Sequence, residues 1–172
     1  MGLFLSFFLC SVSIMSLGGT IVKVANQLFE MSNTFVELRC DIAMPMPGFS
    51  LIEPDIHGLY RPVIVLNPTI IPDDPSVIAH ILGHEWGHHV LRHIEPRGPD
   101  TPPEGSKRRQ EKENEADAYA ARFIRMYNYD TDTIISFLRE HPIDLENRMQ
   151  ILLDTPADQN TRSPLLNSSL SN

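Results

Sequence analysis

The sequence predicts an α+β domain that is mostly helical and contains one small sheet. Its 172 residues, of which 42% are hydrophobic, are enough for a single domain with a packed core. Five segments have the caps or the apolar spacing of amphipathic helices, whereas one short run is rich in β-branched residues. We therefore expect several helices to pack against a sheet of few strands.

Residues 1–18 are expected to be a signal peptide or membrane anchor. Within them, residues 3–17 read LFLSFFLCSVSIMSL, which is shorter than the about 20 residues of a membrane-spanning helix. The run has the length of the apolar part of a signal peptide, and small residues near its end suit a cleavage site. Because no Lys or Arg precedes it, a buried N-terminal helix is the alternative. The segment predicts an exported protein, periplasmic or secreted, or a membrane-tethered one, rather than a cytoplasmic protein.

One helix, one irregular segment and one strand are expected next. Residues 20–39 place apolar side chains at close to helical spacing, which predicts an amphipathic helix. Residues 41–62 are rich in Pro and Gly and predict a loop. Residues 63–67 (VIVLN) lie between Pro62 and Pro68, and prolines at both ends favour an edge strand.

Helices fill the rest of the expected domain, residues 19–153. Asp73-Asp74-Pro75 predicts a helix start, because an acidic N-cap is followed by Pro at the first helical position. This helix should end before Pro96, where a flexible surface loop over residues 95–106 is expected. Further helices are predicted over residues 106–127, 131–140 and 145–153. The Ser- and Asn-rich tail, residues 154–172, is predicted to be disordered.

The predicted helix after Asp74 contains an HExxH motif, His84-Glu85-Trp86-Gly87-His88. Histidines four residues apart share one helix face, so both imidazoles can reach one metal ion. Zinc accepts neutral imidazole nitrogens, and such a pair leaves positions for a third ligand and a water. Glu85 is rotated by about 100° from His84, where it can contact that water as a general base. Gly87 predicts close approach of another backbone, the alternative being a tolerated glycine in a packed helix.

A third metal ligand has to come from another segment. The metzincin pattern is excluded, because the position of its third His holds Ile94. The acidic run Glu113-Asn114-Glu115-Ala116-Asp117 offers alternatives on the next predicted helix. Glu113 can complete a site of two His and one Glu, and Asp117 can accept the second N–H of His84 and fix its tautomer. Glu115 is the competing ligand on a different face. The alternative without a metal is that the acidic run is simply exposed to solvent.

Charge and cysteine content exclude other classes of function. The net charge of −8 disfavours nucleic-acid binding, because phosphate recognition requires a basic surface. Cys10 and Cys40 form no CxxC pair, so neither a Cys-based structural zinc site nor a dithiol redox site is predicted.

Three stretches in order, HEWGHHVLRH, ENEADAYAARF and EHPIDLENR, resemble the HtpX/BepA-type zinc metallopeptidases, the family that includes the CAAX prenyl endopeptidases. That family's pattern is HExxH followed by an Arg-His pair, then ExEAD with a following Ala, and last an HP pair with a downstream Arg. Those positions are held in order by Arg92-His93, Glu113–Asp117, Ala120, His141-Pro142 and Arg148. The resemblance covers about residues 63–153, and three ordered motifs are far more specific than HExxH alone.

The resemblance implies a zincin-like metallopeptidase fold with an active-site helix, a glutamate helix and a small sheet with an edge strand. It implies one Zn²⁺ held by His84, His88 and Glu113, with Glu85 as general base and Asp117 as the partner of a metal ligand. The run VIVLN resembles the family's edge strand, where an extended peptide pairs by β-addition. The resemblance also implies catalytic roles for His141 and Arg148. His141 is expected near the oxyanion, the alternative being a turn residue before Pro142, and Arg148 either there or as an anchor of the last helix.

The sequence thus predicts a zinc-dependent endopeptidase that acts on an unfolded or extended protein or peptide. The alternatives are a regulatory metalloprotein and an inactive metal-binding adaptor of the same fold, although the intact Glu85 disfavours inactivity. His89 and His93 are expected to be structural rather than metal ligands. The transmembrane helices of the family's membrane members are not found here, so we do not expect this chain to share their prenylated substrates. The short segment between the second His and Glu113 suggests an open cleft, closer to the soluble members.

Overall fold

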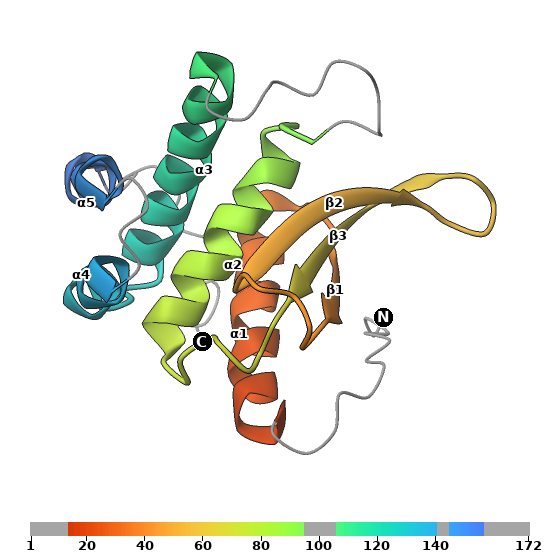
Figure 1. Ribbon diagram of the computed structural model, residues 1–172, viewed down its shortest axis with the longest axis horizontal. Coiled ribbons are helices and arrows are strands. Elements are labelled where there is room, and N and C mark those ends of the chain that lie inside the picture. The colour runs from red at the N-terminus through yellow and green to blue at the C-terminus, as the bar shows by residue number, and fades with distance from the viewer. Residues whose placement is uncertain (1–13, 95–105, 141–144, 157–172) are drawn as a thin grey trace, which may run out of the picture.

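The computed structural model describes residues 14–94, 106–140 and 145–156, and these form five helices and a three-stranded mixed sheet (Figure 1). In chain order the elements are α1 (Ile14–Ser32), β1 (Glu37–Cys40), β2 (Gly48–Pro54), β3 (Tyr60–Leu66), α2 (Pro75–Val90), α3 (Lys107–Met126), α4 (Thr131–Glu140) and α5 (Leu145–Asp154). The predicted α+β class with mostly helices is confirmed. Among the described residues, no helix is long and apolar enough to cross a membrane.

Several sequence predictions lie outside the described residues. These are the leader up to residue 13, the loop over residues 95–105, His141 and the tail beyond Pro156. Helix α1 begins at Ile14, inside the predicted leader.

The predicted edge strand is the central strand of the sheet, so that prediction is wrong. The strand order is β1-β3-β2, with β1 parallel and β2 antiparallel to β3. Pro62 lies within β3 and is paired with Ile52 of β2, but β1 pairs with β3 only from Val63 onwards. At Pro62 the strand therefore has a neighbour on one side only, which is the situation that proline tolerates. The strands at the edges are β1 and β2.

Strands β1 and β2 replace a predicted helix end and a predicted loop. Helix α1 ends at Ser32 rather than at residue 39, because Asn33 has a left-handed conformation with φ 50°. Between β2 and β3 the chain turns at Gly58, with φ 77°, and the Asp55 carboxylate accepts hydrogen bonds from two backbone N–H groups of that turn. Pairing with β3 therefore stabilises β2 in a Pro- and Gly-rich region that reads as a loop.

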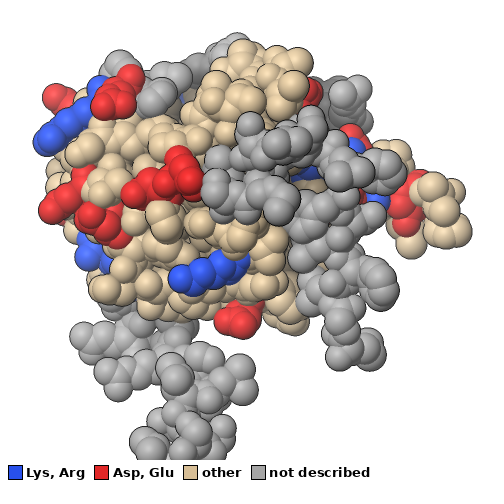
Figure 2. All heavy atoms as spheres, turned by 90° about the horizontal axis from the view of Figure 1, so that it is seen from below, with Lys and Arg blue, Asp and Glu red and all other residues tan. Residues whose placement is uncertain are grey.

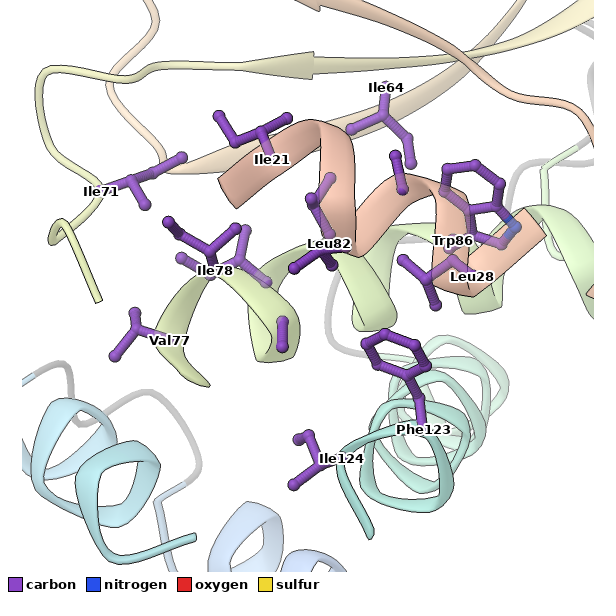
Figure 3. Close-up of a cluster of buried hydrophobic side chains, with 14 of the residues drawn as sticks. Ile21, Leu28, Ile64, Ile71, Val77, Ile78, Leu82, Trp86, Phe123 and Ile124 are labelled. Carbon is purple, nitrogen blue, oxygen red and sulfur yellow. The ribbon is translucent and has the colours of Figure 1, made fainter. Parts of the chain in front are cut away.

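Helix α2 lies at the centre of the fold, between the sheet and α3 (Figure 1). It begins where predicted: the Asp74 carboxylate accepts hydrogen bonds from the N–H groups of Ser76 and Val77, and Pro75 is the first helical residue. Figure 3 shows the apolar cluster around α2, in which Ile78 and Leu82 of α2 lie among Leu28 of α1, Ile64 of β3 and Phe123 of α3. Each such side chain stabilises the fold by about 1.5–3 kcal/mol when fully buried.

Helices α2 and α3 approach each other closely at small residues. A Cβ atom added at Gly83 would lie 3.2 Å from Cα of Ala120, and one added at Gly87 would lie 3.3 Å from Cα of Ala116. Both alanines are fully buried. The close backbone approach predicted for Gly87 is confirmed, and Gly83 has the same role one turn earlier. This contact brings the polar side chains of α3 within reach of the HExxH helix.

Substitution of Gly83 by Val tests this contact. Val has the better helix propensity, but its side chain must push α3 away, and overpacking of this kind costs about 1–3 kcal/mol. We expect Gly83→Val to lower the free energy of unfolding of the metal-free protein by that amount, measured by urea denaturation. Gly19→Val is the control, because Gly19 is an exposed position in α1 with no atom near its added Cβ. Equal stability of the two variants would contradict the close contact.

Candidate metal centre

Two histidines of α2 and one glutamate of α3 bring three possible ligand atoms together. The Nε2 atoms of His84 and His88 lie 3.2 Å apart. Oε2 of Glu113 lies 3.3 Å from Nε2 of His84 and 3.6 Å from Nε2 of His88. These three residues form a group that can hold a metal ion.

The spacing of these three atoms fits a tetrahedral zinc ion. Zinc binds imidazole nitrogen and carboxylate oxygen at about 2.0–2.2 Å, which places ligand atoms at tetrahedral angles about 3.3–3.5 Å from one another. The observed separations of 3.2, 3.3 and 3.6 Å lie around this range. The side chain of Glu113 is 40% exposed, against 13% for His84 and 12% for His88, so the group is accessible from the Glu113 side. Three protein ligands leave a fourth position for water or substrate.

A buried carboxylate of α3 fixes the orientation of His84. Oδ1 of Asp117 lies 2.7 Å from Nδ1 of His84, and the Asp117 side chain is only 4% exposed. Because an ionised carboxylate can only accept, the Nδ1 atom of His84 must carry the proton. The Nε2 atom of a neutral His84 then presents its lone pair to the metal position. The contact between Asp117 and His84 that the sequence predicts is thus present.

Helix α5 supplies the counter-charge for Asp117. The Arg148 guanidinium donates two hydrogen bonds of 3.0 Å to the Asp117 carboxylate, one to each oxygen. The same guanidinium lies 3.2 Å from Nε2 of His80, a buried residue one turn before His84. A buried carboxylate is costly without such partners, so Arg148 holds Asp117 in its ionised form. Arg148 thus contacts the carboxylate that binds Nδ1 of His84, on the side of the imidazole away from Nε2.

The charges of this cluster shift its pKa values strongly. Burial opposes the charged form of His84, but its hydrogen bonds to Asp117 and Glu113 outweigh burial and raise the pKa of His84. Hydrogen bonds from His84 and His88 hold the pKa of Glu113 well below its usual range. Burial opposes ionisation of Asp117, yet His84 and Arg148 lower its pKa to about 2. Both carboxylates are therefore ionised at neutral pH, which a cation site requires.

The general-base candidate, Glu85, faces the edge strand β2. The Ser50 hydroxyl lies 2.5 Å from Oε2 of Glu85 and 2.9 Å from the backbone carbonyl oxygen of the same residue. A Cβ atom added at Gly48 would lie 3.1 Å from Cγ of Glu85, so the strand passes close over the glutamate side chain. Ser50 pairs with Ile64 of β3, and the buried Ile64 shows that this face of the sheet points to the core. The carboxylate of Glu85 thus lies between α2 and the strand at the sheet edge.

Two further histidines lie near the end of α2 and make different contacts. Nε2 of His89 lies 3.1 Å from the carbonyl oxygen of Val63, so His89 points to the sheet and away from Glu113, as expected. His93 lies beside His88, with the two Nδ1 atoms 3.2 Å apart, and its Nε2 atom lies 2.8 Å from Oε2 of Glu115. Glu115, the competing ligand in the sequence, thus contacts His93 rather than the metal group.

Comparison with known proteins identifies no relative of this chain. No protein-family model, no characterised protein and no solved structure matches the chain. The chemical interpretation of the centre therefore depends on its own residues and on the resemblance of its motifs.

The structure brings together most of the residues that the sequence singled out, and adds three contacts. His84, His88, Glu113 and Asp117 lie in one cluster with Glu85 beside it, whereas His141 is outside the described residues.

The sequence interpretation missed Ser50, because its segment reads as a loop. It named no partner for His80, and it treated His93 only as structural. The spacing of His80, one turn before His84 on the same helix face, was the available signal for that residue.

The buried His80 predicts a loss of stability in acid. Burial and the nearby Arg148 lower the pKa of His80 to about 3, although Asp117 opposes this shift. An unfolded His titrates near 6.5, so below that pH the unfolded chain takes up a proton that the folded chain refuses. His80 should therefore cost up to about 2 kcal/mol of stability between pH 7 and pH 5.

Urea denaturation of the metal-free protein and of its His80→Gln variant across this pH range tests the expectation. Gln cannot take up the proton, so the stability of the variant should fall less steeply with acid. All other titrating groups, Asp117 among them, are common to both chains. Parallel pH profiles would show that His80 is not held in its neutral form.

Proposed function

We propose that this chain is a zinc-dependent endopeptidase of the zincin-like type. The observation that carries the proposal is the triangle of ligand atoms from His84, His88 and Glu113, whose edges match a tetrahedral zinc ion. Beside this triangle lies Glu85, on the same helix and next to an open strand edge. A carboxylate base and a zinc site with a free position supply the groups for metal-assisted peptide hydrolysis, and a strand edge can bind an extended peptide beside them.

The side chains of the cluster divide the chemistry among them. When bound, Zn²⁺ lowers the pKa of a water toward neutrality and polarises the carbonyl group of the scissile peptide. Glu85 takes the proton of the attacking water and passes it to the leaving amine. Asp117 keeps the lone pair of His84 on Nε2, and Arg148 holds Asp117 in place. We assign Arg148 to positioning rather than to the oxyanion, because among the described residues its guanidinium contacts His80 and Asp117, the carboxylate that binds Nδ1 of His84.

Strand β2 is the proposed place of substrate binding. Among the described residues β2 pairs only with β3, which leaves its other edge without a strand neighbour there, and Ser50 ties β2 to Glu85. An extended peptide can add to this edge as a further strand, which requires an unfolded or flexible substrate. Correction of the edge strand from residues 63–67 to β2 moves the proposed substrate to the strand that contacts Glu85. Figure 2 shows Asp and Glu side chains together with several Lys and Arg side chains on the face seen from below. The net charge of −8 makes a polyanionic partner unfavourable.

The resemblance to the HtpX/BepA-type metallopeptidases supports this proposal. Its HExxH and ExEAD motifs supply the three ligand candidates and Asp117, and the downstream Arg148 contacts Asp117. As part of the same proposal, the enzyme would be exported or membrane-tethered through the predicted leader and would act there on extended polypeptides.

Metal analysis combined with a proteolysis assay tests the proposal. The purified chain should contain or bind about one zinc per molecule, as expected for a single three-ligand site. It should cleave an unfolded protein such as casein, lose this activity with a zinc chelator and regain it when Zn²⁺ is restored. A chain that binds zinc without cleaving unfolded proteins or peptides would indicate a metal-binding adaptor, and a metal-free, inert chain would refute the proposal.

Substitution of Glu85 separates metal binding from catalysis. Glu85→Gln removes the base but none of the three ligand candidates, so we expect unchanged zinc content and a loss of kcat of roughly 100-fold or more. His84→Ala should lose both zinc and activity. Glu111→Gln is the matched control, because Glu111 is an exposed residue of α3 that pairs with Lys107. Hydrolysis by the Glu85→Gln variant at the parental rate would disprove the assigned role of Glu85.

A further inference from the structure

A chain of hydrogen-bonding groups leads from the surface of α3 to Nδ1 of His88, the ring nitrogen opposite its candidate ligand atom Nε2. Oε2 of Glu115 lies 2.8 Å from Nε2 of His93, and Nδ1 of His93 lies 3.2 Å from Nδ1 of His88. The His93 side chain is 6% exposed, whereas that of Glu115 is 64% exposed. His93 is therefore a buried link between a solvated carboxylate and a candidate metal ligand.

The chemistry of the three groups sets the direction of each hydrogen bond. An ionised Glu115 can only accept, so Nε2 of His93 carries a proton and donates it. In a neutral His93 the Nδ1 atom then has a lone pair, which accepts from Nδ1–H of His88. With its proton on Nδ1, a neutral His88 has its lone pair on Nε2, and this atom lies 3.2 Å from Nε2 of His84 and 3.6 Å from Oε2 of Glu113.

The backbone at the end of α2 holds His93 in this position. Arg92 has a left-handed conformation with φ 58°, and the N–H of His93 donates a 2.8 Å hydrogen bond to the carbonyl oxygen of His88. This closes the helix as a Schellman turn and folds His93 back onto the last turn. A left-handed conformation at a residue other than Gly costs roughly 1–2 kcal/mol. Nζ of Lys112 donates a 2.7 Å hydrogen bond to the His93 carbonyl oxygen, which ties the turn to α3.

We propose that His93 and Glu115 are positioning residues that set the tautomer of His88 for metal binding. The proposal rests on the zinc site of the proposed function. Each histidine ligand then has its own carboxylate from α3: Asp117 contacts His84 directly, and Glu115 acts on His88 through His93. With Glu113 as the ligand, the alternate residues Glu113, Glu115 and Asp117 of the acidic run then have three different roles. Partners of this kind orient the ring and raise the affinity of the site for its metal.

Zinc affinity, measured by competition with a chromophoric chelator, tests the proposal without use of peptidase activity. His93→Leu removes the link, and we expect the zinc affinity to fall roughly 10- to 100-fold. Glu115→Ala should weaken zinc binding by a smaller factor, because water can replace the acceptor at this exposed position. Glu115→Gln keeps an oxygen acceptor and should restore most of the affinity. Glu111→Ala removes the same charge from a similarly exposed residue of α3 and should leave the affinity unchanged.

The ¹⁵N resonances of the His88 ring give a second readout that a purely structural role would not change. In the metal-free protein the contacts of His88 with His93 and with Glu113 compete for its single N–H, so the Nδ1–H tautomer of His88 should be more populated in the wild type than in His93→Leu. Urea denaturation confirms that each variant is folded, and the exposed Glu115 provides a substitution that does not disturb the core.

The results separate this proposal from the proposed function. Wild-type zinc affinity in His93→Leu, or the same effect from Glu115→Ala and Glu111→Ala, would overturn the positioning role. A wild-type chain that binds no zinc would overturn it as well. A chain that binds zinc with the expected sensitivity to His93 but hydrolyses no peptide would refute the peptidase alone and support the positioning role.

Discussion

The close contact between helices α2 and α3 determines where the polar groups of the centre lie. Gly83 and Gly87 on α2 face Ala116 and Ala120 on α3, so the two backbones approach without large side chains between them. At this distance short acidic side chains of α3 reach the imidazoles of α2. A larger residue in the contact would separate the helices and move the carboxylates out of hydrogen-bonding distance. The packing of the two helices thus sets the distances between the polar groups of the centre. The glycines of the HExxH helix contribute to the centre by allowing this close packing.

The same contact explains why α5 belongs to the centre. Asp117 is almost fully buried, and an isolated carboxylate there would cost several kcal/mol. Arg148 from α5 offsets this cost with two hydrogen bonds, and His84 accounts for the remaining contact. The polar cluster therefore connects three helices, with its charged groups satisfied by one another. Such a cluster would hold the three candidate ligands in place before a metal binds, which reduces the ordering that binding requires.

The sequence was sufficient where spacing within one helix decides the outcome. The face shared by His84 and His88, and the one-turn step from Glu113 to Asp117, follow from helical geometry alone. The capping residue Asp74 and the following Pro75 likewise predict the start of α2 from the local sequence alone. The strands could not be predicted in this way, because β1 and β2 are stabilised by pairing with β3 across the chain. The role of His93 likewise depends on a turn that returns the chain onto its own helix, which no local pattern indicates.

The central claim is that His84, His88 and Glu113 hold one zinc ion, and anomalous diffraction at the zinc absorption edge tests it most directly. Crystals of the protein with one equivalent of Zn²⁺ would be measured on both sides of the edge. The account predicts a single anomalous peak at about 2.0–2.2 Å from Nε2 of both histidines and from a carboxylate oxygen of Glu113. The absence of a peak there, or a zinc ion bound only by other residues, would contradict it.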